Sequence, residues 1–425
     1  MLSSYLLTRE SAVQNALELR SAQLGRQYAQ LVRSTTRYFP VRHNGTVNSL
    51  AIDASGRYMI SGGSDSGLAI WDLNGAAGRR HRYAVVGSLA PKRGHRYGIA
   101  AASWWPFDTG MFVTSSFDET VKVWDTNAME EVYTFEMGAR VNSHDLSPTG
   151  AHSLVACAAD SPAIRLLDLR TTAAAQTLVG HARAGVIAVR WSPTNEHMLA
   201  SGGADGTVRL WDIRRSQACL AVLDLETTGL HTGGAAAATS AAWGAGVSHR
   251  GAVNGLLWFD DGTRLVSAGN DEAVRVWDLR PSSRALRSAS NGIINTLVNF
   301  GPLIQNRYMS AVSMVLTPAR DCRAQLLFFP SDSGDLMVFN VATGRLVSRL
   351  SSTAGQRRRK VAGLACRGME YVEIFSGNSE GDIILWEPAT GASRSKSRRR
   401  DDDAEAGGRK KPNVLAEIYR GLDVE

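Results

Sequence analysis

Histidine, serine or threonine, aspartate and tryptophan recur together four times, at nearly fixed spacing, in this chain of 425 residues. The four sets are His43, Ser61, Asp65 and Trp71; His95, Thr114, Asp118 and Trp124; His181, Ser201, Asp205 and Trp211; His249, Ser267, Asp271 and Trp277. In acyl transfer such a histidine takes the proton of the hydroxyl nucleophile. A catalytic triad is needed once, not four times. We therefore interpret the sets as buried hydrogen-bond relays that support structure.

Short strands must position these residues. Residues 180–214 open with Gly180-His181 and close with Trp211-Asp212, and three apolar, β-branched runs lie between turn signals in the interval. Such runs predict strands joined by tight turns. A GH…WD unit of this length is typical of one four-stranded propeller blade, which cannot bury both faces of its sheet alone.

Six further copies complete a predicted ring. They cover residues 43–73, 95–126, 138–169, 248–279, 307–340 and 357–388. The positions aligned with Trp211 are Trp71, Trp124, Leu167, Trp277, Phe339 and Trp386. The sequence predicts an all-β, seven-bladed β-propeller over residues 36–390, with an N-terminal helical arm (1–35) and a disordered charged tail (391–425). We expect residues 36–41, TRYFPV, to close the ring as the outer strand of the last blade.

Composition narrows the functional classes. The net charge of +7 comes mostly from residues 1–42 and 394–411, each at +4, so the propeller is nearly neutral and the basic pI is weak evidence for nucleic-acid binding. The four cysteines form no CxxC pair, and we expect free thiols. No apolar run has the length of a membrane span. We expect no metal, cofactor or catalytic activity, since no metal-ligand spacing, phosphate loop or unique nucleophile with a base occurs.

Residues 8–33 have the periodicity of an amphipathic helix. Its apolar stripe comprises Val13, Leu17, Leu24, Tyr28, Leu31 and Val32. The stripe has no obvious place in the ring. The helix could pack back on the propeller, could be a transit peptide, or could dock on a partner. We favour docking.

The order of strands a to d in a blade assigns each loop to a face. The d–a and b–c loops share one face, here called the top, and the a–b and c–d loops share the other, the bottom. Candidate top-face contacts for a partner are Lys92, Arg93, Arg357, Arg358, Arg359 and Lys360. These are solvated charges or contacts to an acidic partner or to nucleic-acid phosphates; direct nucleic-acid contact stays open. On the bottom, three D-x-R motifs end at Arg170, Arg214 and Arg280 and form a candidate docking patch.

Two segments outside the repeats remain. The Gly/Ala-rich insertion at 225–246 belongs to a top-face loop. Residues 392–412 have blocks of like charge, which predict disorder, and the KSRRR run within them is compatible with a nuclear localisation signal.

Several segments that lie outside the consensus positions of the repeats resemble those of one family. The second unit, with WWPFDTGMF at 104–112, and the segments GRYMISGGSDS (56–66) and NTLVNFG (295–301) resemble the Cockayne syndrome group A family of WD-repeat proteins. The resemblance covers about residues 1–390. The insertion at 225–247, the c–d loop at 281–292 and the tail depart from it.

This resemblance implies a non-catalytic substrate receptor of a cullin-4 ubiquitin ligase in transcription-coupled nucleotide excision repair, in the nucleus. The helix, with Val13, Leu17, Leu24, Tyr28 and Leu31, and the bottom-face arginines Arg170, Arg214 and Arg280 would bind the DNA-damage-binding adaptor protein. The WDxR motif of such receptors matches residues 211–214 and 277–280, and 167–170 with its tryptophan missing. The top face would engage the Cockayne syndrome group B translocase and stalled RNA polymerase II. The alternative is a generic WD-repeat scaffold in a nuclear RNA-processing or chromatin complex.

Overall fold

The computed structural model describes residues 18–77, 81–149, 152–182, 184–215, 218–225, 247–280, 294–351, 359–368 and 371–389. Its contacts divide the chain into two units, residues 1–387 and 388–425. The described part of the first unit consists of strands and a helix at 18–29. No helix among the described residues is long and apolar enough to cross a membrane.

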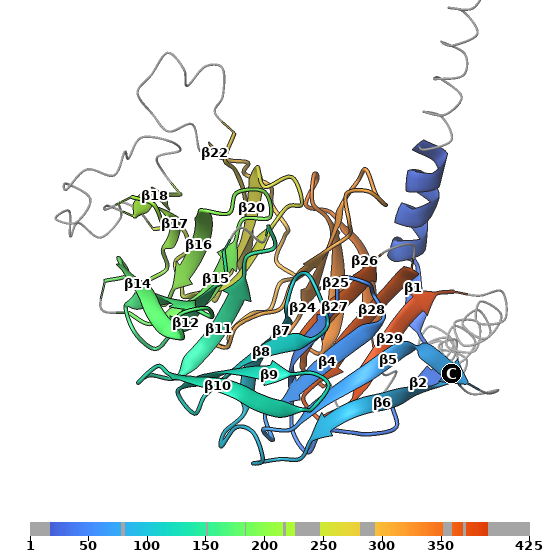
Figure 1. Cartoon of the computed structure of the whole chain (residues 1–425). Helices are drawn as coiled ribbons and strands as arrows, with labels where there is room; N and C mark the ends of the chain where they lie inside the picture. The colour runs from blue at the N-terminus through green and yellow to red at the C-terminus, as the bar shows by residue number, and fades with distance from the viewer. Residues whose placement is uncertain are drawn as a thin grey trace, which may run out of the picture. The chain divides into compact units, whose positions relative to one another are not determined.

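The described strands form seven sheets, one for each predicted repeat, which confirms the seven-bladed propeller (Figure 1). Blades 1 and 2 are β3 (Val47–Ile52), β4 (Tyr58–Gly63), β5 (Leu68–Ala77), β6 (His81–Leu89) and β7 (Ile99–Trp104), β8 (Met111–Ser116), β9 (Thr120–Asp125), β10 (Glu130–Glu136). Blades 3 and 4 are β11 (Val141–Leu146), β12 (Leu154–Ala159), β13 (Ala163–Asp168), β14 (Ala173–Val179) and β15 (Val186–Trp191), β16 (Met198–Gly203), β17 (Val208–Asp212), β18 (Cys219–Leu223). Blades 5 and 6 are β19 (Val253–Trp258), β20 (Arg264–Gly269), β21 (Ala273–Asp278), β22 (Ile294–Asn295) and β23 (Val315–Leu316), β24 (Leu326–Pro330), β25 (Asp335–Asn340), β26 (Leu346–Ser351). Blade 7 is β27 (Val361–Gly368), β28 (Tyr371–Asn378), β29 (Ile383–Pro388) and β1 (Leu31–Arg33).

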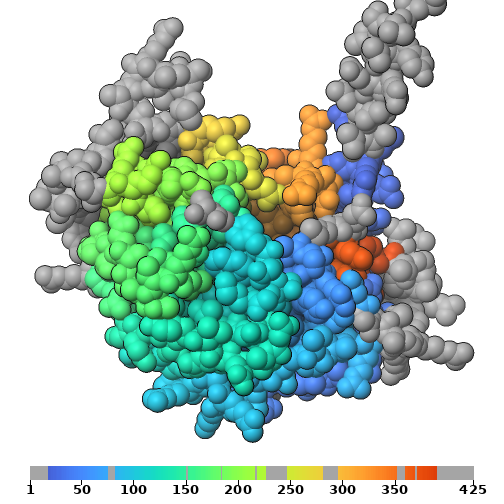
Figure 2. All heavy atoms as spheres, in the orientation of Figure 1, coloured from blue at the N-terminus to red at the C-terminus, as the bar shows by residue number. Residues whose placement is uncertain are grey.

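The hydrophobic core lies between the blades. The described residues form seven clusters of buried apolar side chains, and each cluster joins residues of two neighbouring blades, including the last and the first. Each of the seven positions aligned in the sequence contributes one buried side chain to a different cluster. Leu167 and Phe339 serve in place of tryptophan because the site demands an apolar side chain of adequate volume. In Figure 2 the colours follow one another around the surface in chain order, from blue through green and yellow to orange and red.

The ring closes with a different segment from the one predicted. The outer strand of blade 7 is β1 (Leu31–Arg33), which pairs with β29, and the Ser34 amide continues the pairing by donating to the Leu385 carbonyl at 2.8 Å. The TRYFPV segment instead supplies β2 (Arg37–Tyr38), which pairs in parallel with β6 of blade 1. The prediction of closure by an N-terminal strand is confirmed, but its position at 36–41 was wrong. Residues 31–38 thus contact both sides of the junction.

A network of buried charges also lies at this junction. Glu373 forms ion pairs with Arg37 and with Arg367, the latter at 2.8 Å between Nη1 and Oε2. Arg37 also contacts Glu387 at 2.8 Å, and Arg367 donates from Nε to the Gly56 carbonyl of blade 1 at 2.8 Å. Because Glu373 is nearly inaccessible to solvent, its two arginine partners are needed to offset its desolvation.

Candidate protein-interaction surfaces

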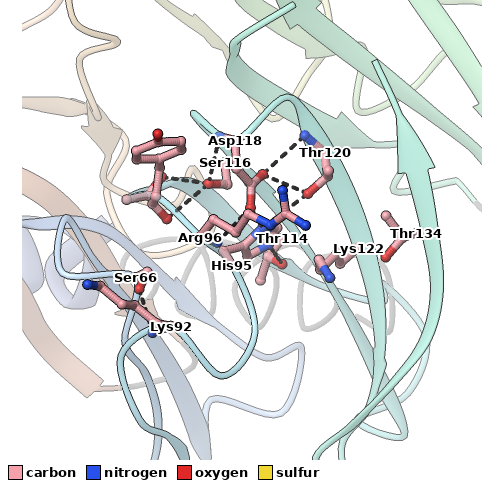
Figure 3. Close-up of polar contacts among 12 residues, drawn as sticks. Ser66, Lys92, His95, Arg96, Thr114, Ser116, Asp118, Thr120, Lys122 and Thr134 are labelled. Carbon is pink, nitrogen blue, oxygen red and sulfur yellow. Dashed lines mark hydrogen bonds and ion pairs between the residues drawn. The ribbon is translucent and has the colours of Figure 1, made fainter. Parts of the chain in front are cut away.

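The four predicted relays are all present. In blade 2, His95 Nε2 lies 2.7 Å from Thr114 Oγ1, and His95 Nδ1 lies 2.9 Å from Asp118 Oδ2. The Trp124 indole donates to the same hydroxyl at 2.8 Å. Figure 3 shows this region, with Asp118 also receiving hydrogen bonds from the amide of Arg96 and the amide and hydroxyl of Thr120. The relays of blades 1, 4 and 5 repeat the contacts among histidine, hydroxyl, aspartate and indole.

The relays have the hydrogen bonds of a catalytic triad, but a substrate cannot reach them. All four hydroxyl-bearing side chains are fully buried, so a substrate in solution cannot reach them. Burial alone would raise the pKa of Asp205, but its hydrogen bonds to His181 and to Thr207 outweigh that effect and lower this pKa to about 2. Burial lowers the pKa of His249 despite its contact with Asp271. Each relay therefore ties the turn between strands b and c to the indole of strand c.

Blade 7 has a partial relay that we did not predict. The Trp386 indole donates to Ser376 Oγ at 2.8 Å. Ser376 stands ten residues before Trp386, the spacing that separates hydroxyl and tryptophan in all four complete sets. That spacing could have revealed the pair.

The D-x-R arginines on the bottom face fall into two types. Arg214 places Nε and Nη2 on the Asp212 carboxylate at 3.0 and 2.9 Å. Arg280 repeats this geometry on Asp278, with Nε at 3.0 Å and Nη2 at 2.6 Å. Both side chains remain about 60 % exposed, and their hydrogen bonds lower the pKa of Asp212 and of Asp278. Arg170 differs, because its Nε donates to Ser153 Oγ at 3.1 Å.

Arg214 and Arg280, here called the chelated arginines because each donates two hydrogen bonds to one aspartate, have a conformation suited to binding a partner protein. Their own aspartate fixes the plane of each guanidinium, so little side-chain entropy is lost when a partner binds. Within the described residues the Nη1 groups of Arg214 and Arg280 make no hydrogen bond, which leaves outward donors for a partner's carbonyl or carboxylate.

The C-terminal part of the arm is built into the ring, which corrects part of the predicted docking surface. Tyr28 is wholly buried and Leu31 is 3 % exposed in the cluster between blades 6 and 7, with Leu24 packed against it. The Tyr28 hydroxyl donates to the Tyr371 carbonyl at 3.4 Å, and its ring meets Phe328 edge to face. Tyr28 and Leu31 therefore cannot contact an adaptor. The chain has to reach β29 with β1, which brings these side chains between the last two blades.

The rest of the helix stands over the bottom face. Glu18 forms an ion pair with Arg323 in the a–b loop of blade 6 at 2.8 Å, and Ser21 Oγ accepts from the Arg323 amide at 2.7 Å. Leu19 is 71 % exposed. Val13 and Leu17 lie outside the described residues. A cleft of about 920 Å³ separates the helix from the loops of blades 5 to 7. Its lining includes Glu18, Arg20, Asp260, Arg320, Arg323 and Arg367.

The predicted top-face arginines and lysines also fall into two groups, those with and those without ion pairs inside the chain. Lys92 and Arg93 are exposed, and neither forms an ion pair with a described residue. Arg359 instead pairs with Asp382 at 2.9 Å, and Lys360 pairs with Asp332 at 3.1 Å. These two are therefore held by the chain itself. Arg357 and Arg358, together with residues 226–246, 281–293 and 390–425, lie outside the described residues.

Two other expectations concern chemistry. All four cysteines, Cys157, Cys219, Cys322 and Cys366, are free, as predicted. Among the described residues no group of three or more histidine, cysteine, aspartate or glutamate side chains could hold a metal ion.

Comparison with known proteins identifies the same repeats. The model of the WD domain, G-beta repeat, matches residues 35–72, 86–125, 174–212 and 246–278, which cover the four blades with complete relays. The chain is 30 % identical to the WD repeat-containing protein ATCSA-1 of Arabidopsis thaliana, over 85 % of this chain and 90 % of that protein. This chain belongs to the WD-repeat family.

Two further relatives match over shorter spans. The chain is 27 % identical to Radiation-sensitive protein 28 of Saccharomyces cerevisiae, over 60 % of this chain and 51 % of that protein. It is 32 % identical to the Ribosome biogenesis protein WDR12 homolog of Drosophila erecta, over 42 % of this chain and 43 % of that protein. The chain thus spans about half or less of these two relatives.

Proposed function

We propose that this WD-repeat protein is a non-catalytic substrate-recognition subunit of a cullin-4 ubiquitin ligase, attached through the DNA-damage-binding adaptor protein and acting in transcription-coupled nucleotide excision repair in the nucleus. The observation that carries the proposal is the pair of chelated arginines, Arg214 and Arg280, on the face over which the helix at 18–29 stands. A helix and a rim of fixed arginines on one face suit a single large partner.

The sequence similarities support the same assignment. The chain spans nearly the whole of ATCSA-1, and another relative is named for radiation sensitivity. The segments WWPFDTGMF and NTLVNFG resemble the Cockayne syndrome group A family outside the repeat consensus. The Cockayne syndrome group B translocase and stalled RNA polymerase II, as partners of the top face, are part of this proposal and follow from that resemblance.

A second candidate is a scaffold in a nuclear RNA-processing or chromatin complex. It is favoured by the similarity to ribosome biogenesis proteins, which covers less than half of the chain. The two proposals differ in their partners, because only the first requires the adaptor and cullin-4.

Co-purification from nuclear extract tests the proposal. We expect the wild type to bring down the adaptor and cullin-4, and the double variant Arg214→Glu/Arg280→Glu to lose them, because reversal of charge removes the outward donors. Arg250→Glu, which alters an exposed arginine of the top face, is the matched control and should retain both partners. Leu19→Asp should weaken binding, whereas Val86→Asp, on the outer strand of blade 1, should not. Absence of the adaptor from the wild-type sample would favour the scaffold.

A further inference from the structure

The top face carries cations of two kinds, distinguished by their ion pairs. Over blades 5 to 7 four of them are neutralised within the chain: Arg307 pairs with Glu272 at 2.5 Å, and Arg42 pairs with Asp382 at 2.5 Å, as Arg359 and Lys360 do with their own acids. Arg250, over blade 5, is exposed and forms no ion pair with a described residue. The exposed cations over blades 1 to 3 form a larger group without such pairs. Exposed side chains there that form no ion pair with a described residue are Lys92, Arg93, Arg96 and Arg140.

The loop that bears three of these cations is held rigidly. The Lys92 amide donates to Ser66 Oγ at 2.8 Å, and Lys92 itself has a φ of 66°, in the left-handed region that non-glycine residues seldom adopt (Figure 3). The Arg96 amide donates to the relay carboxylate of Asp118 at 2.9 Å. Gly94 lies against the relay tryptophan, where a Cβ would come within 2.8 Å of the Trp124 ring. The relay of blade 2 therefore fixes the place from which these side chains extend.

Aromatic side chains lie among the cations. Tyr97 follows Arg96 and is 66 % exposed. The Phe117 amide donates to the Gly98 carbonyl at the end of the loop, at 3.1 Å, and the Arg140 guanidinium stacks over the Phe117 ring at 5.0 Å from its centroid. This stacking holds Arg140 while its N–H groups stay free for a carboxylate. Loop and arginine thus form one continuous surface, here called the cationic quadrant: Lys92, Arg93, Arg96, Tyr97, Phe117 and Arg140.

We propose that the cationic quadrant is a docking site for an acidic, partly apolar segment of a partner protein. Exposed tyrosine beside arginine is the combination that dominates the binding energy of protein interfaces. Unpaired cations on a rigid loop attract carboxylates, and little conformational entropy is lost when they bind. The proposal stands on these contacts alone and does not require the chain to be a ligase receptor.

The exposed acids around the quadrant favour a peptide over nucleic acid. Glu119 and Asp160 are exposed in the b–c turns of blades 2 and 3, on either side of Arg140. A nucleic-acid strand carries a negative charge at every nucleotide and would meet these carboxylates. A peptide can place its carboxylates on the arginines and an apolar side chain on Tyr97.

Fluorescence anisotropy with the full-length chain tests the proposal. The probes are a short fluorescein-labelled peptide of repeating Asp-Leu-Glu and a labelled oligothymidylate of the same length. We expect the wild type to bind the peptide, more weakly as salt is raised, and Arg96→Glu and Arg140→Glu each to weaken binding by about tenfold or more. Thermal melting should show these variants to be folded, because neither side chain forms an ion pair within the described residues.

Arg250→Glu is the matched control. The Arg250 amide donates to the relay carboxylate of Asp271 at 3.1 Å, as that of Arg96 does to Asp118, and its side chain is also exposed but lies over blade 5. It should bind the peptide as the wild type does. No peptide binding by the wild type at about 1 mM, or an equal loss in Arg250→Glu, would overturn the proposal. Tighter binding of oligothymidylate, lost in the same variants, would replace the peptide site with a nucleic-acid site.

Discussion

Blades 4 and 5 are stabilised by hydrogen bonds among their own residues, whereas blades 6 and 7 also pack against the N-terminal arm. The regular blades each have a relay that joins histidine, serine, aspartate and tryptophan. Blade 6 has Phe339 where the tryptophan would stand, and among its described residues blade 7 retains only the Ser376–Trp386 pair of the relay. At the boundary between these two blades the arm contributes Tyr28 and Leu31 to the core.

The junction between blades 7 and 1 also depends on the arm. It combines an apolar cluster with the buried charges of Arg367 and Glu373 and the partly exposed Arg37, which the arm supplies. Blades 4 and 5 thus need no segment from outside their repeats, whereas blades 6 and 7 are completed by the arm. The arm is therefore part of the ring before it is a docking element.

The largest effect should come from the charge network at the junction. Glu373→Gln removes the buried acid that neutralises the buried Arg367 and also pairs with the partly exposed Arg37, and should lower the free energy of unfolding by about 3–5 kcal/mol. The matched control is Glu131→Gln, which breaks the more exposed pair with Lys122 and should cost less than about 1 kcal/mol. Urea denaturation measures both, and equal losses would show that the junction needs no buried charge.

The relays provide the next effect. Ser201 serves both His181 and Trp211, whereas Ser376 serves only Trp386. Ser201→Ala leaves two buried polar groups without partners and should cost about 3 kcal/mol, and Ser376→Ala should cost about 1–2 kcal/mol. The same denaturation experiment tests this order. A larger cost at Ser376 would contradict the view that the relay secures the regular blades.

Within the described residues, blade 3 has no His–Ser–Asp–Trp relay and no arm residue in its hydrophobic clusters. Its buried His144 should make the unfolding free energy depend on pH. Burial, together with the charge of Arg190, lowers the pKa of His144 to about 3, against about 6.5 in an unfolded chain. Between these values the unfolded state binds a proton that the folded state does not. Stability should therefore fall as pH decreases below about 6.5, with His144 contributing about 1.4 kcal/mol per pH unit.

His144→Gln should make the pH dependence of the unfolding free energy shallower by that amount. His152→Gln, which removes a partly exposed histidine of the same blade, is the matched substitution to be measured beside it. Slopes that coincide for the wild type and His144→Gln would mean that this histidine is accessible to protons in the folded protein.

The sequence predicted the ring well because each repeat carries its own signals. Turn residues, alternating apolar runs and the His–Ser–Asp–Trp spacing lie within about 35 residues of one another, so local patterns were sufficient. The closing strand was misplaced because Leu31 and Val32 also continue the helical stripe, and only pairing with β29, more than 350 residues away, decides between the two.

The surfaces were less predictable for a related reason. Arg359 and Lys360 appear as free as Lys92 in the sequence, yet their acids, Asp382 and Asp332, lie in turns of blades 7 and 6 that only the folded blades bring close to them. The chelated geometry of Arg214, in contrast, follows from an aspartate two residues before it. Contacts within a short motif could be predicted, and contacts between separate turns could not.

Two truncations test the central claim that the arm is divided between the ring and the adaptor. Deletion of residues 1–34 removes Tyr28 and β1, and should lower the Tm strongly. Deletion of residues 1–17, which include Val13 and Leu17, should leave the Tm unchanged and yet abolish co-purification of the DNA-damage-binding adaptor protein. Retention of the adaptor by a folded protein that lacks residues 1–17 would contradict the account.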